Sequence, residues 1–391
     1  MKILHTADWH LGAKIEGKDR LAEQEKILNE IAQIADDYDV SGVIIAGDVF
    51  HNKMPSGEAE DLFFKAVEKL SDNGNRLVFV LSGNHDDSLR LGASEPLALR
   101  HNIILATDLD AVDIRRTRTD VRSRIVDAGR GFIKFKRGEE QTTIAFLPFM
   151  GANQTKELAG LDDYKESVKK ISNELASNFS SDSFNLFVGH LFLAGGKLND
   201  GQTISVGEAL SVSPVDLPEK AHYIALGHLH SAKKLGQNCY YSGATIELRV
   251  KDKRPQVNII DGDKNGVNNV FGVTLTSTID VKEITASNIA FAYKKISEEA
   301  ANDYVYLTIS EPTALKASDL RDLKQTYPNI VNVKITPMIN LNEETLTSVD
   351  FKNLSDRELF VKFYFETTGR EPTDELVNLF LECRGEQDAS N

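Results

Sequence analysis

The protein has 391 residues, of which 41% are hydrophobic and 27% are charged. That length and balance exclude a disordered or fibrous chain and leave room for roughly two or three domains, each with its own core. The formal net charge of −14 argues against a broad basic surface that coats nucleic acid, since lysine and arginine supply most of such affinity, so any nucleic-acid contact is expected to be local.

The start of the chain and its cysteines bear on where the protein works. Asp8 comes too early for the apolar core of a secretory signal, and no apolar stretch approaches the length that spans a membrane. Cys239 and Cys383 lie far apart in sequence, which fits a reducing compartment and provides no cysteine-based metal motif. We therefore expect a cytoplasmic protein in which any metal site uses histidine, aspartate and asparagine.

Three apolar strands separated by helices are predicted over the first part of the chain. The strands cover residues 2–6, 43–46 and 77–81, and helices are expected over 20–37 and after Ser56, which suits an N-cap. The polar residues that follow the strands are Asp8 and His10, Asp48 and His51, and Asn84 and His85. This alternation is typical of a doubly wound α/β layer, in which the carboxyl ends of parallel strands meet at one edge and form the site.

The segment 113–137 is rich in basic residues against an acidic background. They are Arg115, Arg116, Arg118, Arg122, Arg124, Arg130, Lys134, Lys136 and Arg137. A solvated strand face or loop is the first interpretation, because most charge runs face water. A contact with a nucleic-acid backbone near the predicted edge is the alternative, and the sequence leaves it open.

Three further strands are predicted over 142–147, 184–188 and 223–226, with a helix over 164–179, and we expect them to continue the same sheet. The histidines that follow the last two strands are His190, His228 and His230. Six of the nine histidines thus come directly after apolar strands, which favours a ligand role over a structural one. Imidazole, carboxylate and amide oxygen without thiolate favour octahedral ions such as Mn²⁺ over structural zinc.

Five short motifs lie in a fixed order between residues 8 and 230. They are Asp8-x-His10, Gly47-Asp48-x-x-His51, Gly83-Asn84-His85-Asp86, Gly189-His190 and Gly227-His228-x-His230. Together they resemble the signature of the calcineurin-like metallophosphoesterases, and most of all the bacterial nucleases of double-strand-break repair in that family. The resemblance implies a layered α/β sandwich. Ala244-Thr245 replaces the usual Ser-Pro after Tyr241-Ser242-Gly243, which leaves the path of that loop open.

The resemblance also implies two divalent metal ions, with Mn²⁺ as the expected metal and Asp48 as the ligand that the two ions share. The first ion would be held by Asp8, His10, Asp48 and His230, and the second by Asp48, Asn84, His190 and His228. His85 would protonate the leaving oxygen or stabilise charge in the transition state, and His51 would assist from the facing turn. The residues alone leave two interpretations of Asp86, which either orients His85 or holds its turn, and Trp9 is expected to pack in the core.

The chain changes character after His230, beyond which no histidine occurs. Strands are predicted over 273–284, 303–309 and 331–335, with a helix over 317–327 that Ser318 or a neighbour caps. The expected domains are a nuclease domain over 1–268, a capping domain over 269–340, a linker over 341–353 and C-terminal helices over 354–391. The resemblance implies that the capping domain helps to select DNA, and a stabilising appendage is the alternative.

Two short helices rich in large apolar residues are expected at the end of the chain. Leu354 followed by Ser355 and Glu358 predicts a staple and a capping box, Gly369 ends the first helix, and Thr373 starts the second. They either pack on their own domain or dock on a partner, and the resemblance favours a coiled-coil ATPase as that partner. Gly195-Gly196-Lys197-Leu198 is not a phosphate-binding loop, so ATP-driven work must come from another chain.

We therefore predict a metal-dependent DNA nuclease that acts with an ATPase in repair, recombination and replication. The expected activities are a 3′–5′ exonuclease on duplex ends and an endonuclease on single strands or hairpins, from a homodimer within a heterotetramer. A phosphoesterase that acts on a small molecule or a phosphoprotein is the alternative with the same metals. A non-enzymatic tether of DNA ends is the third hypothesis, and the full set of predicted ligands weighs against it.

Overall fold

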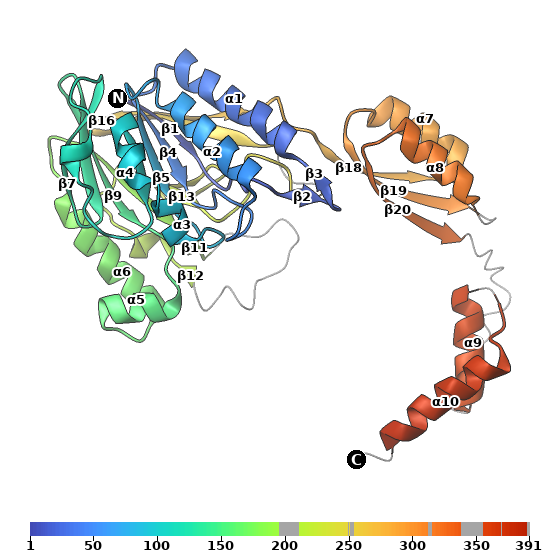
Figure 1. The fold of residues 1–391 in the computed structure, drawn as a ribbon. Coiled ribbons are helices and arrows are strands. Elements are labelled where there is room, and N and C mark those ends of the chain that lie inside the picture. The colour runs from blue at the N-terminus through green and yellow to red at the C-terminus, as the bar shows by residue number, and fades with distance from the viewer. Residues whose placement is uncertain are drawn as a thin grey trace. The chain divides into compact units, whose positions relative to one another are not determined.

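The structure, a computed structural model, describes residues 1–194, 211–248, 250, 254–311, 315–337, 355–368 and 370–388. The chain divides into two units, Met1–Thr336 and Pro337–Asn391, and each is described by itself. Figure 1 shows the helices and strands with their labels. Within the described part of the chain, no helix is long and apolar enough to cross a membrane.

Six strands form the first sheet, in the order β17-β16-β1-β4-β5-β6. They are β1 (Lys2–Thr6), β4 (Gly42–Ala46), β5 (Leu77–Leu81), β6 (Ile103–Ala106), β16 (Gln256–Asp263) and β17 (Gly266–Thr274). The first four run parallel, whereas β16 is antiparallel to β1, and β17 to β16. The three strands predicted at the start of the chain are therefore confirmed, and their carboxyl ends lie along one edge.

Two helices cover the outer face of this sheet, α1 (Leu21–Asp37) and α2 (Gly57–Leu70) (Figure 1). Their apolar sides share one core with alternate residues of β4, such as Val43 and Ile45. The predicted N-cap of α2 is confirmed, since the Ala59 N–H donates to Ser56 Oγ at 3.3 Å. Two short helices, α3 (Ser88–Gly92) and α4 (Glu95–Ala98), follow β5.

The strands expected to extend the first sheet form a second one instead, in the order β14-β15-β13-β10-β9-β8-β7. They are β7 (Ser123–Gly129), β8 (Phe132–Arg137), β9 (Glu140–Leu147), β10 (Phe184–His190), β13 (Tyr223–Gly227), β14 (Lys233–Leu235) and β15 (Cys239–Tyr241). Ile44 and Ala46, the other alternate residues of β4, share a core with Phe187 of β10. Both faces of β4 are apolar, so its sequence does not indicate which face packs against helices and which against a second sheet.

On the other side of the second sheet lie α5 (Ala152–Ala159) and α6 (Tyr164–Leu175) (Figure 1). Val168, Ile171 and Leu175 of α6 pack into the core of that sheet, as their spacing predicts. The helix ends at Leu175, and a 3₁₀ turn over Ala176–Asn178 replaces its predicted last turn. The order of layers is helix, sheet, sheet, helix, which confirms the layered α/β sandwich.

One buried histidine of β1 faces the second sheet across this core. His5 is 0% exposed, and its Nδ1 lies 2.9 Å from the hydroxyl of Tyr223 on β13. Burial lowers the pKa of His5 from its ordinary 6.5 to about 3, because the core stabilises only the neutral ring.

We expect His5 to make the metal-free protein sensitive to acid. Between pH 6.5 and about 3 the unfolded chain binds a proton that folded His5 refuses, so the free energy of unfolding falls as the pH falls through this window. The slope attributable to one such group is up to about 1.4 kcal/mol per pH unit. Urea unfolding from pH 7.5 to 5, with chelator present, should give a shallower slope for His5→Gln than for the wild type. His101→Gln, at an exposed site, should keep the wild-type slope, and equal slopes for all three proteins would contradict the assignment.

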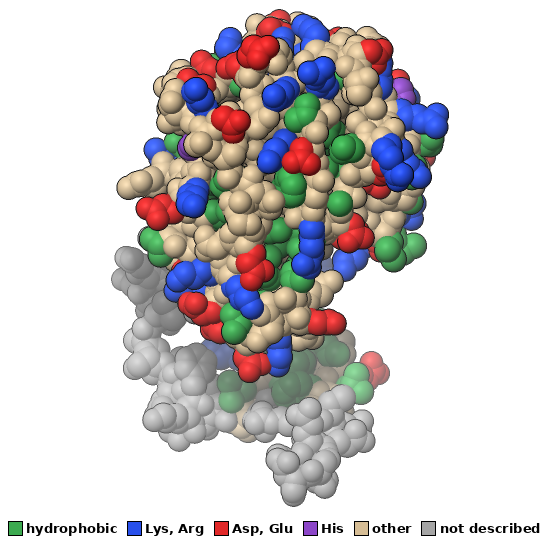
Figure 2. Space-filling model, turned by 90° about the vertical axis from the view of Figure 1, so that its left-hand side faces the viewer, with side chains coloured by type: hydrophobic (Ala, Val, Ile, Leu, Met, Phe, Trp, Pro, Cys, Tyr) green, Lys and Arg blue, Asp and Glu red, His purple; other side chains and the backbone are tan. Residues whose placement is uncertain are grey.

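The basic segment 113–137 lies largely at the end of the sheets that is opposite the predicted site. Arg137 contacts Asp39 at 2.7 Å and Arg122 contacts Asp72 at 2.5 Å, and these carboxylates precede β4 and β5. Arg115 pairs with Asp113. The face in Figure 2 shows basic and acidic side chains interspersed, with no continuous basic patch. These contacts favour the solvated interpretation over a nucleic-acid contact near the site.

After β17 the chain forms a small α/β layer whose three strands lie in the order β18-β19-β20. Its elements are β18 (Val281–Ala286), α7 (Ile289–Glu299), β19 (Tyr304–Glu311), α8 (Ala317–Thr326) and β20 (Ile330–Pro337). The strand predicted over 273–284 is in fact the end of β17 and the start of β18, and β17 spans the predicted boundary after residue 268. Ser318 is not the N-cap of α8, because Lys316 occupies that position without a side-chain cap.

The second unit contains α9 (Asp356–Thr368) and α10 (Asp374–Asp388). The capping box is confirmed: the Ser355 N–H donates to Glu358 Oε2 at 2.8 Å, and the Glu358 N–H donates to Ser355 Oγ at 3.4 Å. Phe360 and Phe380 stack at 4.2 Å between ring centroids. The predicted staple Leu354, the stop Gly369 and the segment 195–198 lie outside the described residues.

Candidate metal centre

All nine predicted site residues lie at the end where the carboxyl edges of the two sheets meet. The first sheet supplies Asp8 and His10 after β1, Asp48 and His51 after β4, and Asn84 and His85 after β5; the second supplies His190 at the end of β10, and His228 and His230 after β13. Hydrogen bonds join the sheets here: among them, the His228 N–H donates to Asp8 Oδ1 at 2.8 Å, and His190 Nδ1 donates to the Ala46 carbonyl at 2.9 Å.

Asp8, His10 and His230 form the first of two groups whose ligand atoms all lie within 4.8 Å of one another. The Nε2 atoms of His10 and His230 are 3.1 Å apart. Burial, and then the neighbouring His230, keeps the pKa of His10 well below its usual range, so its ring is neutral and has a free lone pair to offer. Burial raises the pKa of Asp8 to about 7.

Asp48, His190 and His228 form the second group, and the amide of Asn84 lies between its histidines. Asn84 Oδ1 is 3.0 Å from His190 Nε2 and 2.9 Å from His228 Nδ1. Because a carbonyl only accepts, the bond to Ala46 places a proton on His190 Nδ1 and leaves Nε2 to face the group. Burial lowers the pKa of His228 to about 4, so its ring is neutral as well.

Asp48 lies between the two groups. Its Oδ2 is 3.8 Å from His10 Nε2 of the first group and 3.4 Å from His190 Nε2 of the second. Burial alone would lower the pKa of His190, but the Asp48 carboxylate outweighs burial and raises it to about 9. The same contact holds the pKa of Asp48 well below its usual range. A carboxylate that binds two ions must lie near both groups, as Asp48 does. The roles of these residues as ligands stay predictions.

The donor atoms fit divalent cations. Asp8 Oδ2 is buried and has no hydrogen-bond partner among the described residues. Ligands around one octahedral ion lie about 3 Å apart, which is the spacing of the His10–His230 and His190–Asn84 contacts. Four of the predicted ligands also have left-handed backbone conformations, with φ of 52° at Asp8, 46° at His10, 48° at Asp48 and 95° at His228. Such strain in residues other than glycine is concentrated at functional sites.

Two glycines of the motifs are required by close approach. A Cβ at Gly227 would lie 1.8 Å from the Ala46 carbonyl oxygen, and one at Gly83 would lie 2.2 Å from the Asp48 nitrogen. Real Cβ atoms do not come so near to backbone atoms, so the strand ends could not meet if either position carried a side chain.

His85 and His51 flank the first group. The ring centroid of His10 is 5.0 Å from that of His85 and 5.7 Å from that of His51. The His85 N–H donates to Asp48 Oδ1 at 2.9 Å, and His85 Nδ1 donates to the His51 carbonyl at 2.7 Å. Nδ1 is therefore protonated, and Nε2 is the atom of His85 that can give or take a proton.

The two interpretations of Asp86 are resolved in favour of the turn. Its carboxylate accepts the N–H groups of Gly83 at 2.8 Å, Phe50 at 2.9 Å and Val49 at 3.2 Å. Asp86 thus ties the Asp48 turn to the Asn84 turn and sets how the two strand ends face each other. Trp9 packs, as expected: it is fully buried, it contacts Phe63, and its Nε1 donates to Thr6.

Three further side chains contact the site, and no motif in the sequence points to them. Phe149 and Phe192 place their rings 6.3 Å from His190 and 6.1 Å from His228. Gln24, on α1, bonds the backbone of Trp9 and His10. Each lies outside the motifs, where an apolar or amphipathic pattern has an ordinary packing explanation, so only the tertiary structure reveals them.

Comparison with known proteins identifies the family. Residues 1–232 match the model of the calcineurin-like phosphoesterase family. A relative from Bacillus subtilis, the SbcD subunit of the nuclease SbcCD, is 29% identical over 400 residues, which cover 98% of this chain and 97% of the relative. Its counterpart of the same name from Staphylococcus epidermidis is 24% identical over 377 residues, which cover 94% of each chain. Among solved structures, TT1561 of Thermus thermophilus aligns with 70% of this chain and 98% of its own at 13% identity, with a TM-score of 0.39.

Proposed function

The chain belongs to the calcineurin-like phosphoesterase family, and on that premise we propose that it is a metal-dependent DNA nuclease with Mn²⁺ as its metal. The observation that carries the proposal is the position of Asp48 between two groups that can each hold a cation. Relatives named as parts of a nuclease match over nearly their whole length, which supports DNA rather than a small molecule as the substrate. The proposed activities are the 3′–5′ exonuclease and the single-strand and hairpin endonuclease, in cytoplasmic DNA repair, recombination and replication.

Two bound divalent ions would lower the pKa of a water nucleophile and neutralise charge on the phosphate. The side chains around the ions would hold the two groups in place and donate the proton that the reaction needs. Asp48 keeps the two groups in register, since one of its oxygens faces both groups while the other accepts the His85 N–H. His85 Nε2 donates the proton that the leaving 3′ or 5′ oxygen needs.

His51 assists this step in the proposed mechanism. Its carbonyl fixes the His85 ring through Nδ1, and its own ring stacks on His85 with centroids 6.1 Å apart. Burial, followed by the charge of His85, lowers the pKa of His51, which favours its neutral ring. A neutral ring can accept a hydrogen bond from the substrate or from water without repelling the acid.

An ATPase of the SbcC type is the proposed partner of the C-terminal helices. Phe363, Phe365 and Leu379 are 66%, 51% and 56% exposed within the described part of that unit. Exposed large apolar side chains on short helices are typical of a surface that binds a groove or a coiled coil of another chain. The relatives are named as one component of the two-part nuclease SbcCD, which supports the same assignment. The small layer β18–β20 is proposed to help in selecting DNA.

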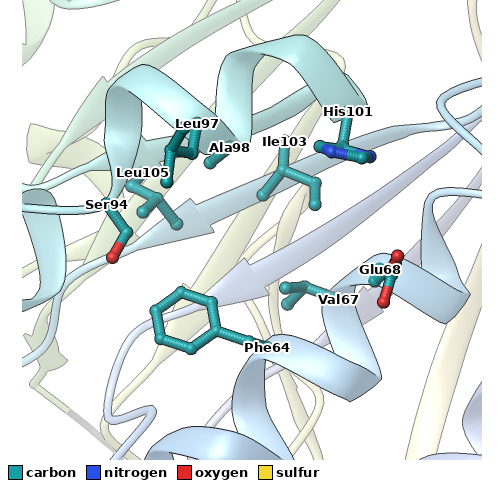
Figure 3. A pocket seen from close by; sticks show the side chains of 9 residues that line it. All are labelled: Phe64, Val67, Glu68, Ser94, Leu97, Ala98, His101, Ile103 and Leu105. Atoms are coloured by element: carbon teal, nitrogen blue, oxygen red, sulfur yellow. The ribbon is translucent and has the colours of Figure 1, made fainter.

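A second copy of the chain is the proposed occupant of an apolar pocket between α2 and α4, as one contact of the expected heterotetramer. Figure 3 shows Phe64 and Val67 of α2 facing Leu97 and Ala98 of α4 across the edge strand β6. The pocket has a volume of about 290 Å³, and Phe64 and Leu97 are 40% and 69% exposed at its rim. A helical surface of this kind can pack against its own copy in a symmetric dimer.

The decisive experiment compares substrates with purified protein and Mn²⁺. We expect cleavage of hairpin and duplex-end DNA to exceed hydrolysis of a chromogenic phosphodiester or phosphomonoester, and EDTA to abolish all of it until Mn²⁺ is restored. A preference for the small esters would instead favour the small-molecule phosphoesterase. Repair function that survives in an Asp48→Ala variant would favour the non-enzymatic tether.

A further inference from the structure

The start of α1 contacts the loop that carries His10 and, through Glu247, the segment that contacts the loop of His230. We infer that Arg20, Glu23 and Gln24, here called the α1 anchor, position His10 and His230 and tie that group to the layer β18–β20. The inference rests on the proposed function, because it assumes that the two groups bind cations. It assigns positioning roles to residues that lie outside the family's motifs.

Gln24 holds the loop that carries His10. Its side chain is 1% exposed, and its Nε2 donates to the carbonyls of Trp9 at 3.2 Å and His10 at 2.9 Å. Its Oε1 accepts the Gly12 N–H at 3.0 Å, so every strong hydrogen-bonding atom of the amide is used. The loop has little freedom to shift while this amide is in place, and His10 itself is in a strained left-handed conformation that needs such support.

Arg20 holds the loop that carries His230, through Glu247. The guanidinium is 2% exposed, pairs with Glu23 through Nε and Nη2 at 2.8 Å each, and donates from Nη1 to the Glu247 carbonyl at 2.5 Å. Three residues before Glu247, the Ala244 N–H donates to the His230 carbonyl at 2.9 Å. This contact also gives the path of the loop after Tyr241-Ser242-Gly243, which the sequence left open.

The side chains of the same two glutamates, Glu23 and Glu247, hold the start of the small layer. The Ile279 N–H donates to Glu23 Oε1 at 3.0 Å, and the Val281 N–H donates to Glu247 Oε2 at 2.9 Å. The Arg20 guanidinium stacks on the ring of Tyr304 in β19 at 4.9 Å. Displacement of the layer would therefore act on Arg20 and Glu247, which support the loop of His230, and on Glu23, the neighbour of Gln24 in α1.

The second cation group is held in a different way. His190 lies within β10 and bonds the Ala46 carbonyl of β4, and the His228 N–H bonds Asp8. Neither contact involves α1, although the second one ends on Asp8 of the first group. The α1 anchor should thus act on the first group and spare the second, which is a result that a general loss of stability would not produce.

Calorimetric titration of the metal-free full chain with Mn²⁺ tests the inference, because it reads binding and not activity. We expect two binding events in the wild type. The event that is lost in His10→Ala is thereby assigned to the first group. Gln24→Met and Arg20→Met should weaken that event about tenfold or more, as loss of a supporting hydrogen bond commonly does, and leave the other event unchanged. Gln24→Met introduces no unpaired charge, so it remains informative if Arg20→Met does not fold.

Arg76→Met is the matched control. Arg76 is also a buried guanidinium, 3% exposed, that bonds the carbonyls of Val40 and Leu70 and pairs with Asp36 at 2.8 Å, at the opposite end of the sheet. Its replacement should leave both Mn²⁺ events unchanged. If a folded Gln24→Met protein binds both Mn²⁺ ions with wild-type affinity, or binds both more weakly to the same extent, the inference is wrong. The proposed function would still stand. A wild-type protein that binds fewer than two ions overturns the proposed function, and the inference with it.

Discussion

Replacement of Asp48 by asparagine is expected to lower DNA hydrolysis by about a thousandfold or more, because metal ions contribute several kcal/mol to stabilising the transition state. Asparagine keeps the size of the side chain and an oxygen that can accept the His85 N–H, so the change is mainly the loss of charge between the two groups. The measurement is the rate of hairpin cleavage at saturating Mn²⁺, together with the number of Mn²⁺ ions bound per chain, which should fall below two.

Asp216→Asn is the control for the Asp48 variant. Asp216 is also a buried carboxylate, 2% exposed, but it accepts the Ser213 N–H and faces lysines of α6 away from the centre. It should keep wild-type cleavage and both ions. An Asp48→Asn protein that cleaves DNA within about tenfold of the wild-type rate would contradict the role of Asp48 as the shared ligand.

Replacement of His85 by alanine is expected to leave both ions bound and to lower DNA cleavage by about 10²–10⁴-fold, the usual contribution of a general acid. His85 contacts Asp48 through its backbone N–H, which alanine retains, so the metal groups should survive. The sharper measurement compares leaving groups. A chromogenic phosphodiester with a weakly basic phenolate needs little protonation, so its hydrolysis should fall much less than that of DNA.

His222→Ala provides the comparison, because His222 lies at the start of β13, at the far end from the centre, where it accepts the Asn185 N–H at 3.2 Å. Its activity should equal that of the wild type on both substrates. Equal losses on DNA and on the phenolate ester in His85→Ala would point to charge stabilisation rather than proton donation. Full DNA cleavage in that variant would remove His85 from the mechanism.

The metal centre could be predicted from the sequence because each part of it is local. A buried parallel strand, a glycine where two backbones approach and a polar residue directly after it are adjacent in the chain, as in Gly83-Asn84 and Gly227-His228. Parallel strands of one sheet align their carboxyl ends, so the residues after β1, β4 and β5 gather at one edge without further information. The packing of the two sheets brings the histidines after β10 and β13 to the same place. The same locality explains why the sequence predicts the caps at Ser56 and at the pair Ser355–Glu358, since a cap involves residues within one turn.

Only the tertiary structure decided which surfaces of the strands meet which partners. Ile44 and Val43 are both apolar, and the sequence of β4 does not indicate that Ile44 faces the second sheet whereas Val43 faces the helices. Asp86, Arg137 and Gln24 are polar residues whose partners lie far away in the chain or on another turn, so their roles depend on how distant segments pack. Local chemistry determined which residues reach the centre; long-range packing decided which elements support it, because those contacts join segments that the sequence separates.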